Sequence, residues 1–194
     1  DPLITNTLIY NNTGYNAGGI YLSNSNPELI NVTIANNTIV DDNTIPASTG
    51  GSIGSFFNSN PKLTNCILWG NSPKEVQSYF AIGSQNFYGN TFTVNHSNIQ
   101  GGSENIDISS ADSLFYHSSN INLDPGFVDA ANGDYHLSNY SPCIAAGLDS
   151  STVPPSDLEG NIRPNPNGSN PDIGAYENAL ASRLPITWYA SATT

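Results

Sequence analysis

Apolar and polar residues alternate along four stretches of the chain that resemble one another. The stretches begin at Pro2, Pro27, Pro61 and Phe92, and they read PLITNTLIYNN, PELINVTIANN, PKLTNCILWGN and FTVNHSNIQGG. Alternation with a period of two is typical of short β-strands, because successive side chains of a strand point to opposite faces. The stretches return at spacings of 25, 34 and 31 residues. A similar unit that recurs at such intervals indicates a solenoid.

Alignment of the four stretches predicts which side chains form the core. Three columns are apolar or small in every copy, and these are the predicted inward positions. They are Ile4, Leu29, Leu63 and Val94; Thr7, Val32, Cys66 and Ser97; and Ile9, Ile34, Leu68 and Ile99. A polar column of Asn6, Asn31, Asn65 and His96 lies between them, and we expect its asparagine amides to bond along the stack at a corner. Residues 18–22 and 50–54 predict a second strand in each coil, so the sequence predicts an all-β parallel β-helix.

The composition agrees with many tight turns and little helix. The chain of 194 residues is long enough for one solenoid domain, and it contains 17 Gly and 13 Pro. No window shows sustained apolar spacing of three and four residues. The two cysteines do not form a disulfide framework. Cys66 occupies an inward column, where we expect a buried free thiol. The alternative is a bridge to Cys143.

The charge balance disfavours several classes of partner. Four Lys and Arg residues stand against 16 Asp and Glu, which gives a formal net charge of -12. Phosphate binding needs clustered cations, so we expect no nucleic-acid partner. No run of about 18 apolar residues exists, so we expect no membrane insertion. The chain begins in mid-repeat without a leader, and we interpret it as part of a longer exported protein, secreted to the cell surface.

The repeat fades after residue 105, and a different set of motifs follows. These are DPGFVD, GDYHL, SPCIAAG, DLEGNIR and PDIGAYE, between Asp124 and Glu177. Together with the repeated pattern they resemble the choice-of-anchor Q family of right-handed parallel β-helix proteins, whose fold is related to that of pectate lyases. The resemblance implies rungs over 1–105 and a last rung with an irregular C-terminal cap over 106–178. Residues 179–194 would be a linker or the start of a following segment, because 183–194 are similar to the stretch before the sorting module of proteins exported by the type IX route.

The pectate-lyase likeness implies a Ca²⁺ ion held by acidic side chains beside an Arg or Lys base. The aligned rungs offer no acidic column for such an ion. Lys62 shares an outward column with Glu28, so we expect a cross-strand ion pair. Arg163 lies between acidic residues that include Asp172 and Glu177, and we expect an Arg to carboxylate bond that locks the cap. The sequence therefore predicts no catalytic residue and no cofactor, with Ca²⁺ left open.

Aromatic residues give the most specific prediction of a ligand site. Tyr10 and Trp69 share an outward column two rungs apart, a separation of about 10 Å. That separation suits stacking on alternate units of an extended glycan. Tyr79 and Tyr88 lie in the longer departure from the repeat and are further candidates. The alternative is that loop residues cover Trp69.

Three functions are compatible with these features. The first is a non-catalytic adhesive or glycan-contacting scaffold, which the sequence favours. The second is the C-terminal fragment of a polysaccharide lyase or glycoside hydrolase whose site lies upstream. The third is an extracellular fibre subunit that stacks head to tail through open β-helix ends.

Overall fold

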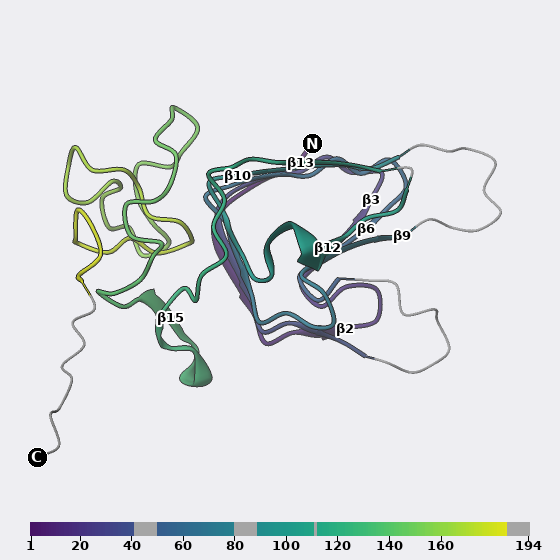
Figure 1. Cartoon of the computed structure of the whole chain (residues 1–194), viewed down its shortest axis with the longest axis horizontal. Helices are drawn as coiled ribbons and strands as arrows, with labels where there is room; N and C mark the ends of the chain where they lie inside the picture. Colours follow the sequence, from purple (N-terminus) through teal and green to yellow (C-terminus); the bar gives the residue numbers. More distant parts are fainter. Residues whose placement is uncertain (41–49, 80–88, 111, 186–194) are drawn as a thin grey trace, which may run out of the picture.

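The structure, a computed structural model, describes residues 1–40, 50–79, 89–110 and 112–185. It is all-β, with parallel strands in curled sheets that resemble the coils of a β-helix (Figure 1). The first ten elements are β1 (Leu3–Tyr10), β2 (Thr13–Gly14), β3 (Ile20–Ser23), β4 (Glu28–Ala35), β5 (Thr38–Ile39), β6 (Ile53–Phe56), β7 (Lys62–Thr64), β8 (Ile67–Trp69), β9 (Val76–Tyr79) and β10 (Thr91–Asn95). They are followed by β11 (Asn98–Ile99), β12 (Ile106–Asp107), β13 (Ser113–Tyr116), β14 (Phe127–Asp129) and β15 (Asp134–Leu137). The described helices are two short 3₁₀ turns, Gly102–Asn105 and Ala130–Asn132.

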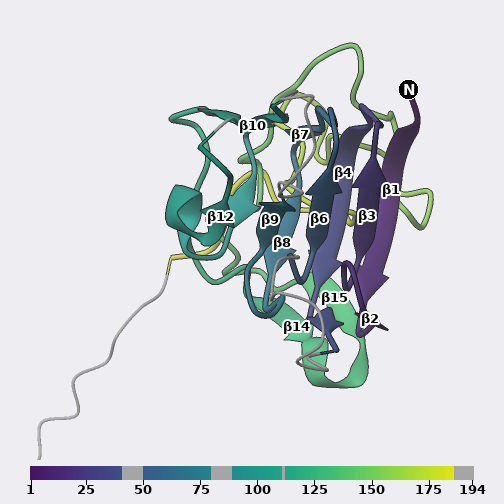
Figure 2. The ribbon, with the colours of Figure 1, turned by 90° about the vertical axis from the view of Figure 1, so that its right-hand side faces the viewer.

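The strands that derive from the repeats pair in the register of the sequence alignment. Glu28 lies opposite Leu3 on one side and Lys62 on the other. Leu29 likewise lies opposite Ile4 on one side and Leu63 on the other. The seven-stranded sheet runs β11-β8-β4-β7-β10-β13, with β1 paired to β4. A four-stranded sheet, β12-β9-β6-β3, contains the second strand of each coil, and Figure 2 shows these strands stacked in order. The predicted strand at 18–22 is thus β3, and its partner at 50–54 overlaps β6.

The inward columns form the main core. Leu29, Leu63 and Val94 are at most 1% exposed, and the Ile34, Leu68 and Ile99 column is fully buried. Ile53 and Val76 extend the same cluster to the four-stranded sheet. Burial of this kind contributes about 25 cal/mol per Å² of apolar surface, which makes the core the main stabilising contact of the coils. Cys66 and Cys143 are both buried free thiols, so the predicted free thiol is confirmed.

The corner column differs from the prediction. Asn6, Asn31, Asn65 and His96 all have positive φ, between 44° and 55°. Asparagine tolerates this left-handed conformation, which turns the chain sharply at one residue. The amides do not stack strongly along the axis, because the single contact between them, Asn65 Nδ2 to Asn31 Oδ1, is 3.4 Å long. They bind the C-terminal part of the chain instead.

The continuous amide ladder lies at another corner. Asn12 Nδ2 donates to Asn37 Oδ1 at 3.0 Å, and Asn37 Nδ2 donates to Asn71 Oδ1 at 2.9 Å. Asn71 Nδ2 in turn donates to Glu75 Oε2 at 2.6 Å. The amides of Asn37 and Asn71 also donate to backbone carbonyls of the preceding coil, Ile9 O at 3.0 Å and Ile34 O at 2.8 Å. The buried carboxylate of Glu75 is therefore its terminal acceptor.

The C-terminal segment, which we define as residues 124–180, lies beside the seven-stranded sheet (Figure 1). Asn31 Nδ2 donates to Asp172 O at 2.9 Å, and Asn65 Nδ2 donates to Leu148 O at 3.0 Å. Asn6 makes the corresponding bond to Ser156 O at 2.7 Å. The segment thus contacts successive coils along their side. It lies along a face of the coils, because the corner amides and the outward residues next to them supply its docking surface.

Candidate functional site

The expected ionic lock of the C-terminal segment is built around Arg163. Its Nε donates to Glu177 Oε2 at 2.8 Å, and both side chains are completely buried. Arg163 Nη1 also donates to Asn6 Oδ1 at 2.6 Å, which ties the segment to β1. Asp172 has no direct bond to the guanidinium, but its backbone N–H donates to Glu177 Oε2 at 3.2 Å. Because the buried Arg163 guanidinium and Glu177 carboxylate neutralise each other's charge, this ion pair stabilises the segment and is not accessible to a substrate.

Asp172 is the second carboxylate of that group. Burial and then the neighbouring charge of Glu177 raise the pKa of Asp172 to about 7. Its two oxygens accept hydrogen bonds from Ala145 N and Asn178 N, both at 2.7 Å, which oppose the rise. The carboxylate therefore joins two parts of the C-terminal segment.

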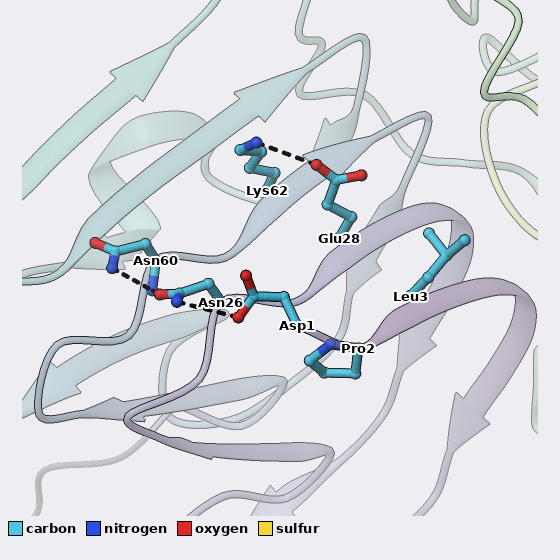
Figure 3. A pocket seen from close by; sticks show the side chains of 7 residues that line it. All are labelled: Asp1, Pro2, Leu3, Asn26, Glu28, Asn60 and Lys62. Carbon is cyan, nitrogen blue, oxygen red and sulfur yellow. Dashed lines mark hydrogen bonds and ion pairs between the residues drawn. The ribbon is translucent and has the colours of Figure 1, made fainter.

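Lys62 and Glu28 form the predicted cross-strand pair, with Nζ 3.1 Å from Oε1. The pair lines a shallow pocket of about 370 Å³ at the edge of the coils (Figure 3). Asp1 Oδ1 accepts from Asn26 Nδ2 at 3.1 Å, and Asn60 Nδ2 donates to Asn26 Oδ1 at 2.7 Å. Lys62 and Glu28 are both exposed, and the ammonium of Lys62 is bound to the carboxylate of Glu28. It is not poised for proton abstraction.

The predicted face of Tyr10 and Trp69 is shared with the C-terminal segment. Ala35, which lies between them in the column, is fully buried. Trp69 packs against the second core cluster, which includes Ile67 and Ile173, and Tyr10 rests on Tyr135 with ring centres 5.1 Å apart. The contact with the segment favours the alternative in which other residues cover Trp69, whereas Tyr10 remains 40% exposed.

Of the other two candidates, Tyr79 lies on the four-stranded sheet. Tyr79 is the last residue of β9, and its backbone pairs with Phe56 of β6. Its side chain and all of Tyr88 lie outside the described residues.

The structure places an aromatic cluster on the outer face of the four-stranded sheet that we did not single out. Tyr21 and Phe56 have ring centres 5.1 Å apart, and Phe56 lies 6.2 Å from Phe57. Tyr21 is 47% exposed and Phe57 is 45% exposed. Alternation carried a signal for this face, because Ile20 and Leu22 pack inward and leave Tyr21 outward. The signal was missed because the pairing of β3 with β6 brings Tyr21 and Phe56 together only in the fold.

Polar side chains continue the same sheet beyond the aromatic cluster. Gln77 pairs with Gly54 on one side and with Asp107 on the other, and Gln77 Nε2 donates to Asp107 Oδ2 at 3.2 Å. The face therefore combines exposed rings with an amide and a carboxylate, an arrangement that can contact both the apolar and the hydroxyl groups of a ligand.

His136 is held between two acidic side chains. Its Nδ1 lies 2.6 Å from Asp134 Oδ1, and its Nε2 lies 3.2 Å from Glu159 Oε2. Its ring centre lies 4.1 Å from that of Tyr176, and the two ring planes are tilted by 33°. Burial lowers the pKa of His136, but the bonds to the two carboxylates outweigh burial and raise it. Both ring nitrogens are thus engaged, as suits a structural histidine.

The two cysteines are not activated as nucleophiles. Burial raises the pKa of Cys66 and of Cys143 to about 12, so both remain protonated thiols.

Within residues 1–40, 50–79, 89–110 and 112–185, no three or more His, Cys, Asp or Glu side chains gather in a way that would hold a metal ion. The same residues contain no helix with the length and apolar character needed to span a membrane.

Comparison of the chain with protein-family models, with curated proteins and with solved structures gave no match. The fold and its side-chain geometry therefore carry the functional argument.

Proposed function

We propose that this chain is a non-catalytic module of a secreted or cell-surface protein, and that it contacts glycans through the outer face of the four-stranded sheet. The observation that carries the proposal is the cluster of Tyr21, Phe56 and Phe57, in which Tyr21 and Phe57 are exposed, beside Gln77 and Asp107. Aromatic rings bind the apolar faces of sugars, while amide and carboxylate groups bind their hydroxyls.

The finer assignment of the fold is part of this proposal. A right-handed parallel β-helix of the choice-of-anchor Q type is supported by the parallel pairing of β1, β4, β7 and β10 in the register of the repeats. The hand follows the general preference of parallel crossovers. A solenoid of this kind presents a rigid, flat face on which rungs lie about 4.8 Å apart, which suits an extended polymer.

The states of the cationic residues favour binding over catalysis. Lyase chemistry would use an Arg or Lys base, but Arg163 is buried against Glu177 and Lys62 is paired with Glu28. Lys74 Nζ contacts Glu104 O at 3.5 Å. The net charge of -12 would repel polyuronates, so we expect a neutral glycan.

A glycan array followed by calorimetry tests the proposal on the full chain. We expect Tyr21→Ala and Phe56→Ala each to weaken binding of a neutral oligosaccharide by about fivefold, because an aromatic contact contributes on the order of 1 kcal/mol. Phe115→Ala is the matched control, since Phe115 is 62% exposed but lies on β13 of the other sheet. Equal losses in all three variants, or no retained glycan, would refute this face as the site.

A further inference from the structure

His136 connects two parts of the C-terminal segment that lie 23 residues apart in the sequence. It lies on β15, in the hairpin that β14 and β15 form beside the coils (Figure 1). Its Nε2 lies 3.2 Å from Glu159 Oε2, which belongs to a turn over residues 157–161. Asp157 closes that turn, because its Oδ1 accepts from Glu159 N and Asn161 N, both at 2.9 Å. The contact therefore joins the hairpin to the turn, away from the proposed glycan face.

The geometry around His136 is that of a doubly protonated ring. Nδ1 lies 2.6 Å from Asp134 Oδ1, while Nε2 faces the carboxylate of Glu159. An ionised carboxylate only accepts hydrogen bonds, and a neutral imidazole has a single N–H to donate. Both contacts can therefore be hydrogen bonds only while the ring carries both protons.

A neutral His136 keeps only one of these two bonds. The Nδ1 contact is the shorter one, and Asp134 Oδ1 is also held by the backbone N–H of His136 at 3.0 Å. We therefore expect the remaining proton on Nδ1, which leaves a lone pair on Nε2 opposite the Glu159 carboxylate. Two acceptors that face each other cannot form a hydrogen bond. Loss of one proton thus breaks the contact to the turn and keeps the contact within the hairpin.

We propose that His136 is a pH-operated clamp, in which the imidazolium holds the β14–β15 hairpin to the turn over residues 157–161 and deprotonation releases Glu159. Burial lowers the pKa of His136, but its bonds to Asp134 and Glu159 outweigh burial and raise it. The clamp is therefore closed below the ordinary histidine pKa of about 6.5, and it opens as pH rises through the higher pKa of the folded chain.

Two further groups lie close to the clamp in the described part of the chain. The ring centre of Tyr176 is 4.1 Å from that of His136, and an aromatic ring within about 6 Å attracts a cation. Burial raises the pKa of Tyr176, and the charges of Glu159 and Asp134 raise it further, so its phenol stays neutral in this range. Asp157 Oδ2 accepts from Asn161 Nδ2 at 3.0 Å within its own turn. Asp134 and Glu159 are therefore the groups that set the pH at which the clamp opens.

The clamp connects the two places where the C-terminal segment is fixed to the first coils. On the hairpin side, Tyr135 OH accepts from Asn36 Nδ2 at 2.9 Å. On the turn side, Glu177 N donates to Asp157 Oδ2 at 3.0 Å, and Glu177 is the partner of Arg163 in the buried ion pair. We therefore expect the segment to be held more tightly in mildly acidic solution than in alkaline solution.

The first test is a pH titration of the full chain by NMR of the histidine ring nitrogens. We expect His136 to titrate at a higher pH than His96, whose pKa is lowered by burial and by the charge of His117. The neutral His136 ring should carry its proton on Nδ1. A pKa of His136 at or below that of His96, or a proton on Nε2 of the neutral ring, would overturn the proposal without any substitution.

The second test is hydrogen–deuterium exchange of the amides in residues 157–161, corrected for the intrinsic rate at each pH. In the unaltered chain we expect exchange to be about threefold faster at pH 8.5 than at pH 6, the size of effect that a partly exposed ion pair gives. Glu159→Gln should abolish this difference, because its amide has both a donor and an acceptor and can bond either form of His136. Glu28→Gln, which removes the same charge from the coils, is the matched control and should keep the difference.

Asp172 provides a competing explanation, because burial and the charge of Glu177 raise its pKa to about 7 in the same segment. A difference that persists in Glu159→Gln would assign the effect to Asp172 and refute the clamp. Equal exchange at both pH values in the unaltered chain would refute it as well.

Discussion

At the scale of single residues, the most unusual group is the carboxyl of Glu75. It is completely buried and ends the amide ladder, accepting from Asn71 N at 3.2 Å and from Asn71 Nδ2 at 2.6 Å. Burial raises the pKa of Glu75 from 4.5 to about 7, although the bonds from Asn71 lower it. The two hydrogen bonds from Asn71 stabilise a negative charge on the Glu75 carboxylate, whereas its burial away from water disfavours that charge.

This conflict predicts a pH dependence of stability. A carboxyl whose pKa is raised on folding contributes most below its unfolded pKa and loses that contribution as pH rises through its folded pKa. Glu75 therefore lowers the free energy of unfolding between about pH 4.5 and 7, by about 3 kcal/mol in total.

Glu75→Gln tests this prediction. The variant should lose that slope, so urea denaturation of both proteins at pH 5 and pH 8 should show a smaller fall for the variant. An equal fall in the free energy of unfolding from pH 5 to pH 8 in the two proteins would contradict a raised pKa at this position.

At the scale of elements, the corner asparagines combine a backbone and a side-chain role. Asn31 has φ of 55°, and its Nδ2 donates to Asp172 O and Gly174 O, at 2.9 and 3.1 Å. The sharp bend continues β4 around the coil, and the amide holds the C-terminal segment on that bend. Two substitutions separate these roles.

We expect Asn31→Gly to destabilise the chain by about 1–3 kcal/mol, because it leaves buried carbonyls without a donor but keeps the left-handed backbone. Asn31→Ala should cost about 1–2 kcal/mol more, because alanine also strains the corner. Thermal unfolding measures both values. Equal effects would mean that the backbone conformation is not held in solution, and no effect in either would mean that the segment does not depend on this amide.

At the scale of the whole molecule, the packing of the C-terminal segment against the seven-stranded sheet joins the non-repetitive part of the chain to the coils. Its second core cluster includes Ile67 of β8 together with Cys143 and Ile173 of the segment. Gly174 lies close to Thr33 and Ile67, where a Cβ would come within 2.7 Å of the Ile67 side chain. Arg163 joins this packing to Asn6 of the first coil.

Arg163→Met should cost about 3–5 kcal/mol, because it leaves the carboxylate of Glu177 buried without its counter-charge. Lys62→Met is the matched control in the other ion pair. Its partners are 63% and 48% exposed, so the expected cost is about 0–1 kcal/mol. Urea denaturation gives both values, and limited proteolysis should show release of the C-terminal segment in the Arg163 variant alone. Similar costs for the two variants would count against a structural lock.

Much of the fold could be predicted from the repeats, while the ligand face could not. The columns of Leu29 and Ile34 are the buried core that their alternation indicated. By contrast, the outward column of Tyr10 and Trp69 was a candidate ligand face, yet Ala35, which pairs with both residues, is fully buried. Alternation tells which face of a strand a residue takes, but it does not tell whether another segment covers that face.

The sequence by itself therefore determined the strands of the aligned repeats, their parallel register and their inward columns, because these depend on local periodicity and on the matching of neighbouring repeats. Only the tertiary structure decided that the C-terminal segment lies beside the sheet, that Arg163 reaches Asn6, and that Tyr21 meets Phe56 on the opposite sheet. The C-terminal segment contains no repeat that could be aligned. Its position depends on the corner amides and the outward apolar side chains of the coils, which find their partners in the segment.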